Sequence, residues 1–354
     1  MRVAILGAGM IGAVHRRAAL LAGAQIVGVL ASSPESSKRA AAEWGVAPLE
    51  SLDDLAALAP DVVHVCSPNG LHVEHVEAAL AAGAHVICEK PLSVDTAQAA
   101  RLANAAQAAG RVATVPFVYR FHPLVREIRA RVRAGEFGAW QLLHGSYLQD
   151  WLLSPDATSW RVDPALGGAS RTFADIGSHW CDLMEFVTGE RIVTVSAEMT
   201  TTVAERAGVT VTTEDAAVVT FRTASGVLGS VTVSQVSAGR KNRLWFEFDG
   251  AHKSAVFDQE NPETVWLGAA GSAEILHRDA SIGSSEQQRL SSLPAGHAQG
   301  YAQCFENFVA DTYAAVSGES PEGLPTFADG VRSARIVDAV VESARTGTRV
   351  TVDA

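Results

Sequence analysis

The sequence predicts an α/β domain with a doubly wound parallel sheet, followed by an α+β domain built on an open, mostly antiparallel sheet. Short apolar runs alternate with amphipathic stretches as far as residue 115, a pattern typical of strands and helices that follow one another in a parallel sheet. From residue 141 onward, apolar and polar residues alternate without intervening helices, which indicates antiparallel strands. The chain has 354 residues, enough for two domains, and we place them at 1–119 and 120–354.

The first strand is predicted at Val3–Leu6, a continuous apolar run of the kind that is buried on both faces of a sheet. A loop with the spacing G-x-G-x-x-G follows at once, and an amphipathic stretch follows the loop. The strand, the loop and the helix together predict a site that binds the pyrophosphate of a dinucleotide at the helix N-terminus. The weaker alternative is a glycine-rich turn that binds no ligand. The residues expected to contact the cofactor here are Gly7, Gly9, Met10, Ile11 and Gly12.

The second strand, Gln25–Leu30, is followed by residues that bear on the choice of cofactor. In dinucleotide domains an acidic residue about 20 positions after the glycines usually holds the adenosine ribose. Ser32 and Ser33 stand at that place here, with Lys38 and Arg39 a few residues later. Hydroxyls beside cations suit a 2′-phosphate, so the sequence favours NADP over NAD modestly. It is an equally good interpretation that Lys38 and Arg39 are ordinary solvated charges on the helix surface.

Two further strands end in polar residues that suit ligand binding. The strand Asp61–Cys66 and the strand Ala84–Cys88 each lead directly into a turn. Open α/β sheets bind their ligands at the carboxyl ends of the strands, so we expect Lys90 to point into the crevice there. Pro91 fixes the chain direction and is a candidate for a cis peptide bond. Further candidate cofactor contacts at these two ends are Ser67, Asn69, His72 and Glu89.

The first domain closes with a helix predicted at Ser93–Gly110 and a last strand at Arg111–Val115. The segments Ser67-Pro-Asn-x-x-His72 and Ala82-Gly-Ala-His-Val-Ile-Cys-Glu-Lys-Pro91 together resemble the Gfo/Idh/MocA family, the group of glucose–fructose oxidoreductase and inositol dehydrogenase. The resemblance implies a Rossmann domain that binds NAD or NADP. It also implies that Lys90 lies beside the nicotinamide and the substrate hydroxyl.

The second domain begins, by the same resemblance, near Arg120, which is expected to reach cofactor or substrate at the domain junction. A helix ending at Gly135 follows, and we interpret its arginines as a solvated face. Residues 269–298, rich in Gly, Ser and Ala, are predicted to form a long loop. The predicted strands are Gln141–Gln149, Val193–Val203, Ala216–Thr223, 227–234, 244–249 and Val350–Val352, and the later helices are Tyr301–Val316 and Phe327–Ala344.

An open face on this sheet has a consequence for assembly. Strands that follow one another without helices between them leave one face of the sheet uncovered, and such a face is commonly buried by a second subunit. We therefore expect a homodimer or a homotetramer.

The predicted chemical centre is the segment that contains Asp175, His179 and Asp182. Their spacing of i, i+4 and i+7 places all three on one face of a helix. By spacing alone, an Asp/His pair is more often structural than catalytic, and metal ligation is a further alternative. The pattern D-x-G-x-H after a glycine pair, however, resembles the catalytic helix of the family.

The resemblance implies that His179 is the acid/base and that Asp175 orients the substrate or the imidazole. It also implies substrate contacts from Arg120, Trp160, Arg161 and Asp182. The segment 169–174 departs from the family, which usually has a third glycine and a shorter link there. That departure concerns the wall of the pocket and therefore the identity of the substrate.

The activity implied is hydride transfer between a nicotinamide cofactor and a hydroxyl or keto carbon of a sugar, polyol or cyclitol, with His179 taking the hydroxyl proton and Lys90 stabilising the alkoxide. Two alternatives stay open: an NAD-dependent glycosidase or lyase that uses transient oxidation, and a dinucleotide-binding regulator without turnover. The intact set Lys90, Asp175 and His179 speaks against the regulator.

Composition excludes several other classes of protein. The net charge is −11 and no basic stripe offsets it, which argues against nucleic acid as a partner. The four cysteines lie far apart, so we expect no metal site and no disulfide framework. No apolar run is long enough to span a membrane, and the glycine loop occupies the place of a signal peptide, so we expect a cytoplasmic protein.

Overall fold

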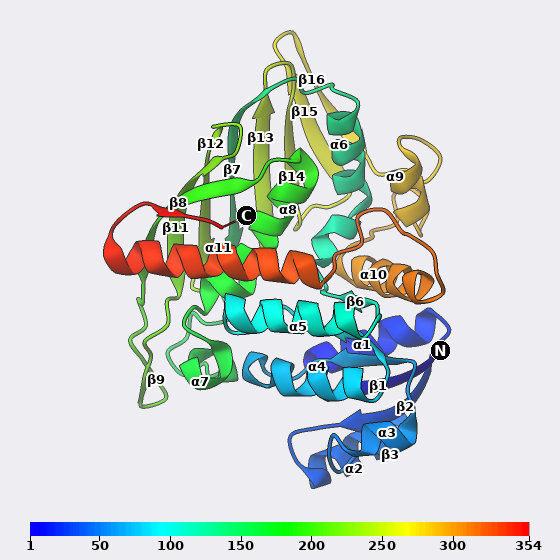
Figure 1. Cartoon of the computed structure of the whole chain (residues 1–354). Helices are drawn as coiled ribbons and strands as arrows, with labels where there is room; N and C mark the ends of the chain where they lie inside the picture. The colour runs from blue at the N-terminus through cyan, green and yellow to red at the C-terminus, as the bar shows by residue number, and fades with distance from the viewer. Residues whose placement is uncertain (354) are drawn as a thin grey trace. The chain divides into compact units, whose positions relative to one another are not determined.

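The structure, a computed structural model, describes residues 1–353 and divides into two compact units (Figure 1). Unit 1 comprises Met1–Val118 and Ala302–Ala334, and unit 2 comprises Tyr119–Tyr301 and the chain from Arg335 onward. The expected division at residue 119 assigns 302–334 to the second domain, whereas the structure groups these residues with the first. The reason is tertiary: the first helix of this segment contacts unit 1, where the Arg17 guanidinium lies 3.1 Å from the Glu306 carboxylate.

Unit 1 is built on a six-stranded parallel sheet, as the sequence predicts. The strand order is β3-β2-β1-β4-β5-β6, so the order reverses between β1 and β4, and that reversal is where doubly wound sheets bind their ligands. The strands β1, β4 and β5 are buried along almost their whole length, which explains why their sequences are mostly apolar. The strands are β1 (Arg2–Leu6), β2 (Gln25–Leu30), β3 (Ala47–Pro48), β4 (Val62–Val65), β5 (His85–Cys88) and β6 (Ala113–Thr114).

The helices of unit 1 begin and end where local capping groups allow. The helix expected from Ser93 begins at Thr96, because the Asp95 carboxylate accepts a hydrogen bond from the Gln98 backbone N–H and caps it. The helix after β2 is capped by Ser33 and ends at Gly45, which adopts a left-handed conformation. These helices are α1 (Met10–Leu21), α2 (Pro34–Trp44), α3 (Asp54–Leu58), α4 (His72–Ala81), α5 (Thr96–Ala108) and α10 (Tyr301–Val316).

Unit 2 is built on a nine-stranded sheet of order β16-β15-β14-β13-β7-β12-β11-β8-β17. All neighbouring strands are antiparallel except β12 and β7, which run parallel. The expectation of an open, mostly antiparallel sheet is therefore confirmed. The strands are β7 (Trp140–Leu148), β8 (Ile192–Thr200), β11 (Ala216–Thr223), β12 (Leu228–Ser234), β13 (Arg243–Gly250), β14 (Ser254–Asp258), β15 (Thr264–Ala269), β16 (Ser272–His277) and β17 (Val350–Thr351), with a separate hairpin of β9 (Glu205–Arg206) and β10 (Val209–Thr210).

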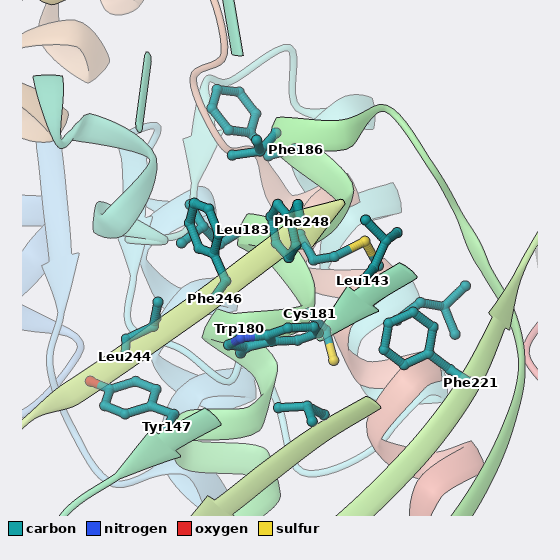
Figure 2. Close-up of a cluster of buried hydrophobic side chains, with 14 of the residues drawn as sticks. Leu143, Tyr147, Trp180, Cys181, Leu183, Phe186, Phe221, Leu244, Phe246 and Phe248 are labelled. Carbon is teal, nitrogen blue, oxygen red and sulfur yellow. The ribbon is translucent and has the colours of Figure 1, made fainter. Parts of the chain in front are cut away.

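One face of this sheet packs against three helices and forms the core of unit 2. The helices are α6 (Pro123–Arg133), α8 (Ser178–Thr188) and the second half of α11 (Phe327–Thr346). Figure 2 shows how Trp180 and Leu183 of α8 gather with aromatic side chains of β11 and β13, among them Phe221, Phe246 and Phe248. The Cβ-less Gly145 of β7 lets the Trp180 indole lie against the strand, since a Cβ there would come within 2.4 Å of the indole nitrogen.

The opposite face of the sheet carries exposed apolar side chains. From Ala217 onward the residues of β11 alternate between buried and exposed positions, and Val218 is 50% exposed. Leu142 of β7 and Leu228 of β12 are 38% and 45% exposed. A sheet with this pattern has a second face that the chain's own described residues leave partly open.

Two expectations for unit 2 are wrong. The stretch 269–298 is not one long loop, because it contains the edge strand β16 and the short helix α9 (Ser285–Leu290). The sequences of these two elements carry no apolar periodicity, so the pattern does not reveal them. The arginines of α6 are not a simple solvated face either. Arg126 is 1% exposed, and its guanidinium lies over the rings of Phe121 and Phe186 at 5.1 and 4.9 Å. No helix within residues 1–353 is long and apolar enough to cross a membrane.

Candidate active site

The glycine loop after β1 has the geometry of a pyrophosphate cradle. Gly7 has a φ of +118°, and a Cβ on it would come within 2.4 Å of the Cys66 carbonyl oxygen. A Cβ on Gly12 would come within 2.0 Å of the Gly7 carbonyl oxygen, so this residue lets α1 approach the loop closely. A Cβ on Gly9, by contrast, would meet no atom of the described chain within 4 Å, and no side chain caps α1. The fold itself thus requires Gly7 and Gly12, whereas Gly9 faces open space at an uncapped helix N-terminus, which fits a bound dinucleotide.

The serines expected to select the cofactor lie at the start of α2. The Ser33 hydroxyl caps this helix, accepting a hydrogen bond of 3.2 Å from the Ser36 backbone N–H. The Arg39 guanidinium donates to the Ser36 hydroxyl at 2.8 Å, so it lies on the same side of the helix as this cap. The Lys38 ammonium lies 3.6 Å from the Glu50 carboxylate instead, with both side chains exposed. Arg39 is therefore the cation that lies close to the serines.

His72 connects the two turns that follow β4 and β5. The side chain is completely buried, with one ring nitrogen 2.9 Å from the Ser67 carbonyl oxygen and the other 3.0 Å from the Pro91 carbonyl oxygen. Burial lowers the pKa of the imidazole, and a neutral ring donates to only one of these two carbonyls at a time. The Lys90–Pro91 bond is cis, as the sequence suggested. His72 therefore holds together the turns that carry Ser67, Asn69 and Lys90.

Glu89 is a buried carboxylate directly before Lys90. The residue is 7% exposed. One carboxylate oxygen accepts a hydrogen bond from His15 Nε2 at 2.9 Å, and the other accepts one from the Lys90 backbone N–H at 3.1 Å. Burial is the largest single influence and acts to raise the pKa of Glu89, but the hydrogen bond from His15 and the electrostatic influence of His15, Lys90 and His72 together hold the pKa below its ordinary value. Glu89 is therefore a fixed acceptor at the carboxyl end of β5.

In unit 2, Asp175 lies in an unusual turn directly before α8. The segment Phe173–Gly177 is π-helical, a local geometry that is frequent at functional sites. Asp175 Oδ2 accepts a hydrogen bond of 2.7 Å from Gln235 Nε2, and the Arg161 Nε lies 3.7 Å from Asp175 Oδ1. Two of the predicted site residues, Asp175 and Arg161, are thus brought together, although the helix is not the regular one that the spacing suggested.

His179 lies on the first turn of α8, among aromatic rings. His179 is 8% exposed. Its ring lies edge-on to the Tyr119 ring, with the centroids 5.0 Å apart, and its centroid is 6.4 Å from that of the Tyr147 ring. Burial raises the pKa of the Tyr147 phenol well above its usual range, and the negative charge of Asp175 acts in the same direction. Tyr147 is thus a neutral hydroxyl that lies close to both His179 and Asp175.

The hydroxyls of these two tyrosines form a closed ring of hydrogen bonds with Asn242. The Asn242 amide donates to the Tyr119 hydroxyl at 3.1 Å, the two hydroxyls are 2.5 Å apart, and the Tyr147 hydroxyl donates to the Asn242 amide oxygen at 2.7 Å. Each hydroxyl can therefore donate once and accept once, which fixes its direction. Sequence reasoning missed all three residues.

A second set of missed residues links Asp175 to an exposed tryptophan. Gln235 is fully buried, and besides Asp175 its amide approaches Gln149 Oε1 at 3.4 Å. Gln149 Oε1 also accepts from the Trp151 indole at 2.9 Å, while the Gln149 amide donates to Asn242 at 2.8 Å. A signal existed in the sequence: Gln149 and Gln235 are amides placed directly after strands whose inward positions are otherwise apolar.

The remaining predicted residues of unit 2 are engaged with one another. The Arg120 guanidinium donates to both carboxylate oxygens of Asp182, with 2.8 Å from Nε to Oδ2, and it lies 4.8 Å from the Phe186 ring centroid. The Arg161 guanidinium lies over the ring of Trp160 at 4.5 Å. Asp182, which lies on α8 together with His179, is therefore neutralised by Arg120.

The chain matches known families and structures along nearly its whole length. Residues 1–117 match the family profile described as "Oxidoreductase family, NAD-binding Rossmann fold", and residues 125–256 match the "GFO/IDH/MocA C-terminal domain". Levoglucosan dehydrogenase of Pseudarthrobacter phenanthrenivorans is 30% identical over 341 residues, which cover 88% of this chain and 86% of that protein.

Two solved structures resemble the fold closely. A levoglucosan dehydrogenase in complex with NADH and L-sorbose has a TM-score of 0.92 and 27% identity, covering 100% of this chain and 99% of that one. An inositol dehydrogenase homolog from Azotobacter vinelandii, in complex with NADH and myo-inositol, has a TM-score of 0.89 and 27% identity, covering 99% of this chain and 97% of that one.

Proposed function

Because the chain belongs to the Gfo/Idh/MocA oxidoreductase family, we propose that its catalytic residues are Lys90, Asp175 and His179. The chain is an oxidoreductase that transfers a hydride between a nicotinamide cofactor and a hydroxyl-bearing or keto carbon of a sugar or polyol. The observation that carries the residue assignment is the environment of Asp175 and His179. A carboxylate held by Gln235 and a buried imidazole share the neighbourhood of the Tyr147 hydroxyl.

In this reaction the bound nicotinamide supplies the hydride acceptor or donor. His179 accepts the proton of the substrate hydroxyl as the carbon is oxidised, and returns it in the reverse direction. The positive charge of Lys90 stabilises the negative charge that develops on the substrate oxygen. Asp175, held in place by Gln235, accepts hydrogen bonds from a substrate hydroxyl or from the imidazole.

Substrate contacts are assigned to the polar groups that lie around Asp175. Arg161 and Trp160 form one side, with the guanidinium near Asp175 and stacked on the indole. Trp151, whose indole is held by Gln149, offers a half-exposed ring to an apolar sugar face. Arg120 and Asp182 are proposed to contribute as an ion pair rather than as separate groups.

The cofactor contacts proposed in unit 1 follow the geometry of the loops. The glycine loop, including Met10 and Ile11, receives the pyrophosphate at the start of α1. Ser67, Asn69 and Glu89 lie at the carboxyl ends of β4 and β5, and His72 acts there by holding the turns in place. The absence of a carboxylate at Ser32 and Ser33, together with Arg39 beside the serine cap, supports a modest preference for NADP over NAD.

The sheet of unit 2 supports a homo-oligomer, either a dimer or a tetramer. The exposed side chains Leu142, Val218 and Leu228 share the open face, and a second copy of the chain would remove them from water.

A substrate screen tests the function directly. The purified protein is incubated with cyclitols, aldoses, anhydrosugars and sugar acids, each with NAD and with NADP, and reduced nicotinamide is followed by its absorbance. We expect turnover with at least one polyol or sugar. Cleavage of a glycoside with no net change in nicotinamide would instead identify the chain as a glycosidase or lyase.

A further inference from the structure

A chain of four buried polar side chains runs through unit 1 and ends beside Lys90. The Tyr313 hydroxyl lies 2.9 Å from His64 Nε2, His64 Nδ1 lies 3.0 Å from His15 Nδ1, and His15 Nε2 lies 2.9 Å from Glu89 Oε1. Both histidines are completely buried, and Glu89 and Tyr313 are 7% and 6% exposed. The four residues come from α10, β4, α1 and the turn after β5, so the chain joins four separate elements.

The hydrogen bonds of this chain have only one arrangement when both rings are neutral. Burial lowers the pKa of His64 well below its usual value, so this ring is neutral. The Glu89 carboxylate only accepts, so His15 carries its proton on Nε2 and accepts at Nδ1. His64 must then donate from Nδ1 and accept at Nε2 from the Tyr313 hydroxyl. Every polar atom of the two rings is used, and His15 is held from both sides.

We propose that His15 is a positioning residue for Lys90. His15 donates a hydrogen bond to one oxygen of Glu89, and the other oxygen accepts a hydrogen bond from the Lys90 backbone N–H. The two contacts together set the direction of the backbone at the carboxyl end of β5. His15 lies on α1, the helix whose N-terminus follows the glycine loop. The hydrogen-bonded side chains thereby connect α1, whose N-terminus is proposed to receive the pyrophosphate, to Lys90, which is proposed to stabilise the reacting oxygen. This inference rests on the proposed catalytic role of Lys90.

The physical reason lies in the burial of Glu89. A buried carboxylate is costly unless hydrogen bonds or charges compensate it, so loss of the His15 donor leads Glu89 to take up a proton or to turn toward water. Either change removes or weakens the acceptor for the Lys90 N–H. Displacement of a catalytic group by about 1 Å costs up to about 100-fold in rate, even when the change is made away from the reacting atoms.

Two substitutions of His15 separate this role from simple packing. The terminal amide of His15→Gln reaches the position of Nε2 and keeps a donor for Glu89. The amide of His15→Asn reaches only the position of Nδ1, so it keeps the contact with His64 and loses Glu89. Phe305→Leu is the matched control, because the Phe305 ring packs edge-on against His15 at 4.8 Å without a hydrogen bond. Lys90→Ala tests the proposed function on which the inference rests.

The readouts are kcat, KM, cofactor affinity by fluorescence and the midpoint of urea unfolding. We expect His15→Asn to lower kcat by about 10- to 100-fold with cofactor affinity changed by less than about threefold. His15→Gln and Phe305→Leu are expected to stay within about threefold of the unmodified protein in kcat. Equal losses in both His15 variants, or no loss in His15→Asn while Lys90→Ala is inactive, would overturn the inference. Normal turnover of Lys90→Ala would overturn the proposed function itself.

The pH profile gives a readout that packing alone would not move. In His15→Asn, Glu89 loses the largest of the influences that lower its pKa, so the acidic limb of kcat is expected to move to higher pH. If neither His15 variant folds, Glu89→Gln makes the same test, with an expected loss of kcat of about 10-fold; kcat at the unmodified level would overturn the inference. The titratable groups that face Glu89 are His15, His72, Lys90, Cys66 and Cys88, and His15 in turn faces His64.

Discussion

Gln235 holds Asp175: the amide nitrogen of this fully buried glutamine donates a hydrogen bond of 2.7 Å to one carboxylate oxygen of the aspartate. Gln235 follows β12, and Asp175 lies in the π-helical turn before α8, so the contact joins the sheet to the helix that carries His179. A carboxylate next to a buried imidazole needs a fixed direction to orient either that ring or a substrate hydroxyl. Gln235 supplies that direction.

Replacing Gln235 with leucine is therefore expected to lower kcat/KM by about 10- to 100-fold, since a hydrogen bond to a charged group is worth about 1.5–3 kcal/mol. Gln235→Glu is expected to be worse, because it places a second carboxylate against Asp175. Steady-state kinetics measure both. Thr232→Ala, on the exposed side of β12, is the control. Kinetics of Gln235→Leu indistinguishable from those of the control would show that Asp175 does not depend on this contact.

The sequence predicts the scaffold of unit 1 well, because the buried parallel strands are short, mostly apolar runs. β2 and α10 even begin and end at the residues expected, Gln25–Leu30 and Tyr301–Val316. What the pattern could not show is that α10 belongs to unit 1. That placement depends on contacts distant in sequence, such as Tyr313 with His64, which no local pattern reveals.

The candidate site was predictable only in part, and the reason is chemical. Asp175 and His179 carry a recognisable motif, whereas the groups that orient them are ordinary Tyr, Asn and Gln residues from distant strands. Tyr119 and Asn242 are 123 positions apart, yet their side chains are 3.1 Å apart. Likewise, the sequence around Arg126 does not indicate that its guanidinium is buried over two phenylalanine rings, because an arginine on a helix face is usually interpreted as solvated.

Arg39 is expected to decide the cofactor preference. It lies with the serine cap of α2, and a charge-assisted contact with a 2′-phosphate is worth about 1.5–3 kcal/mol, so Arg39→Ala should weaken NADP binding by about tenfold or more and leave NAD binding unchanged. Fluorescence titration with both cofactors measures this. Lys38→Ala, which removes a cation paired with Glu50, is the matched control. Equal effects on NAD and NADP would refute the assignment.

The open face of the unit 2 sheet makes a prediction about assembly. Val218→Asp places a charge on this face and should shift the protein from an oligomer toward a monomer in light scattering at micromolar concentration. Val209→Asp is the matched control, because Val209 is 64% exposed on the separate hairpin. A monomer before any substitution, or equal behaviour of the two variants, would argue against this face as the interface.

His122 is expected to make unit 2 sensitive to acid. Burial lowers the pKa of this imidazole from 6.5 to about 4. Because the folded-state pKa lies below the unfolded one, the unfolded state binds the proton more readily, so the stability is present above about pH 6.5 and is lost toward pH 4. Between pH 7 and pH 5 this loss is on the order of 2 kcal/mol.

The test is urea unfolding at these two pH values. His122→Gln should show a smaller drop in the unfolding midpoint between pH 7 and pH 5 than the unmodified protein, even if it is less stable at pH 7. His277→Gln, at an exposed position, serves as the control and should keep the full drop. If the drop is the same in His122→Gln as in the control, His122 does not take up the proton responsible.

The kcat of His179→Ala, measured together with its cofactor affinity on the substrate found by the screen, tests the central assignment most directly. Removal of the general base is expected to lower kcat by about 10²- to 10⁴-fold while NAD and NADP bind as before, since the glycine loop is untouched. His144→Ala, which removes a half-exposed histidine on β7, should keep normal turnover. A kcat of His179→Ala within about twofold of that control would contradict the account.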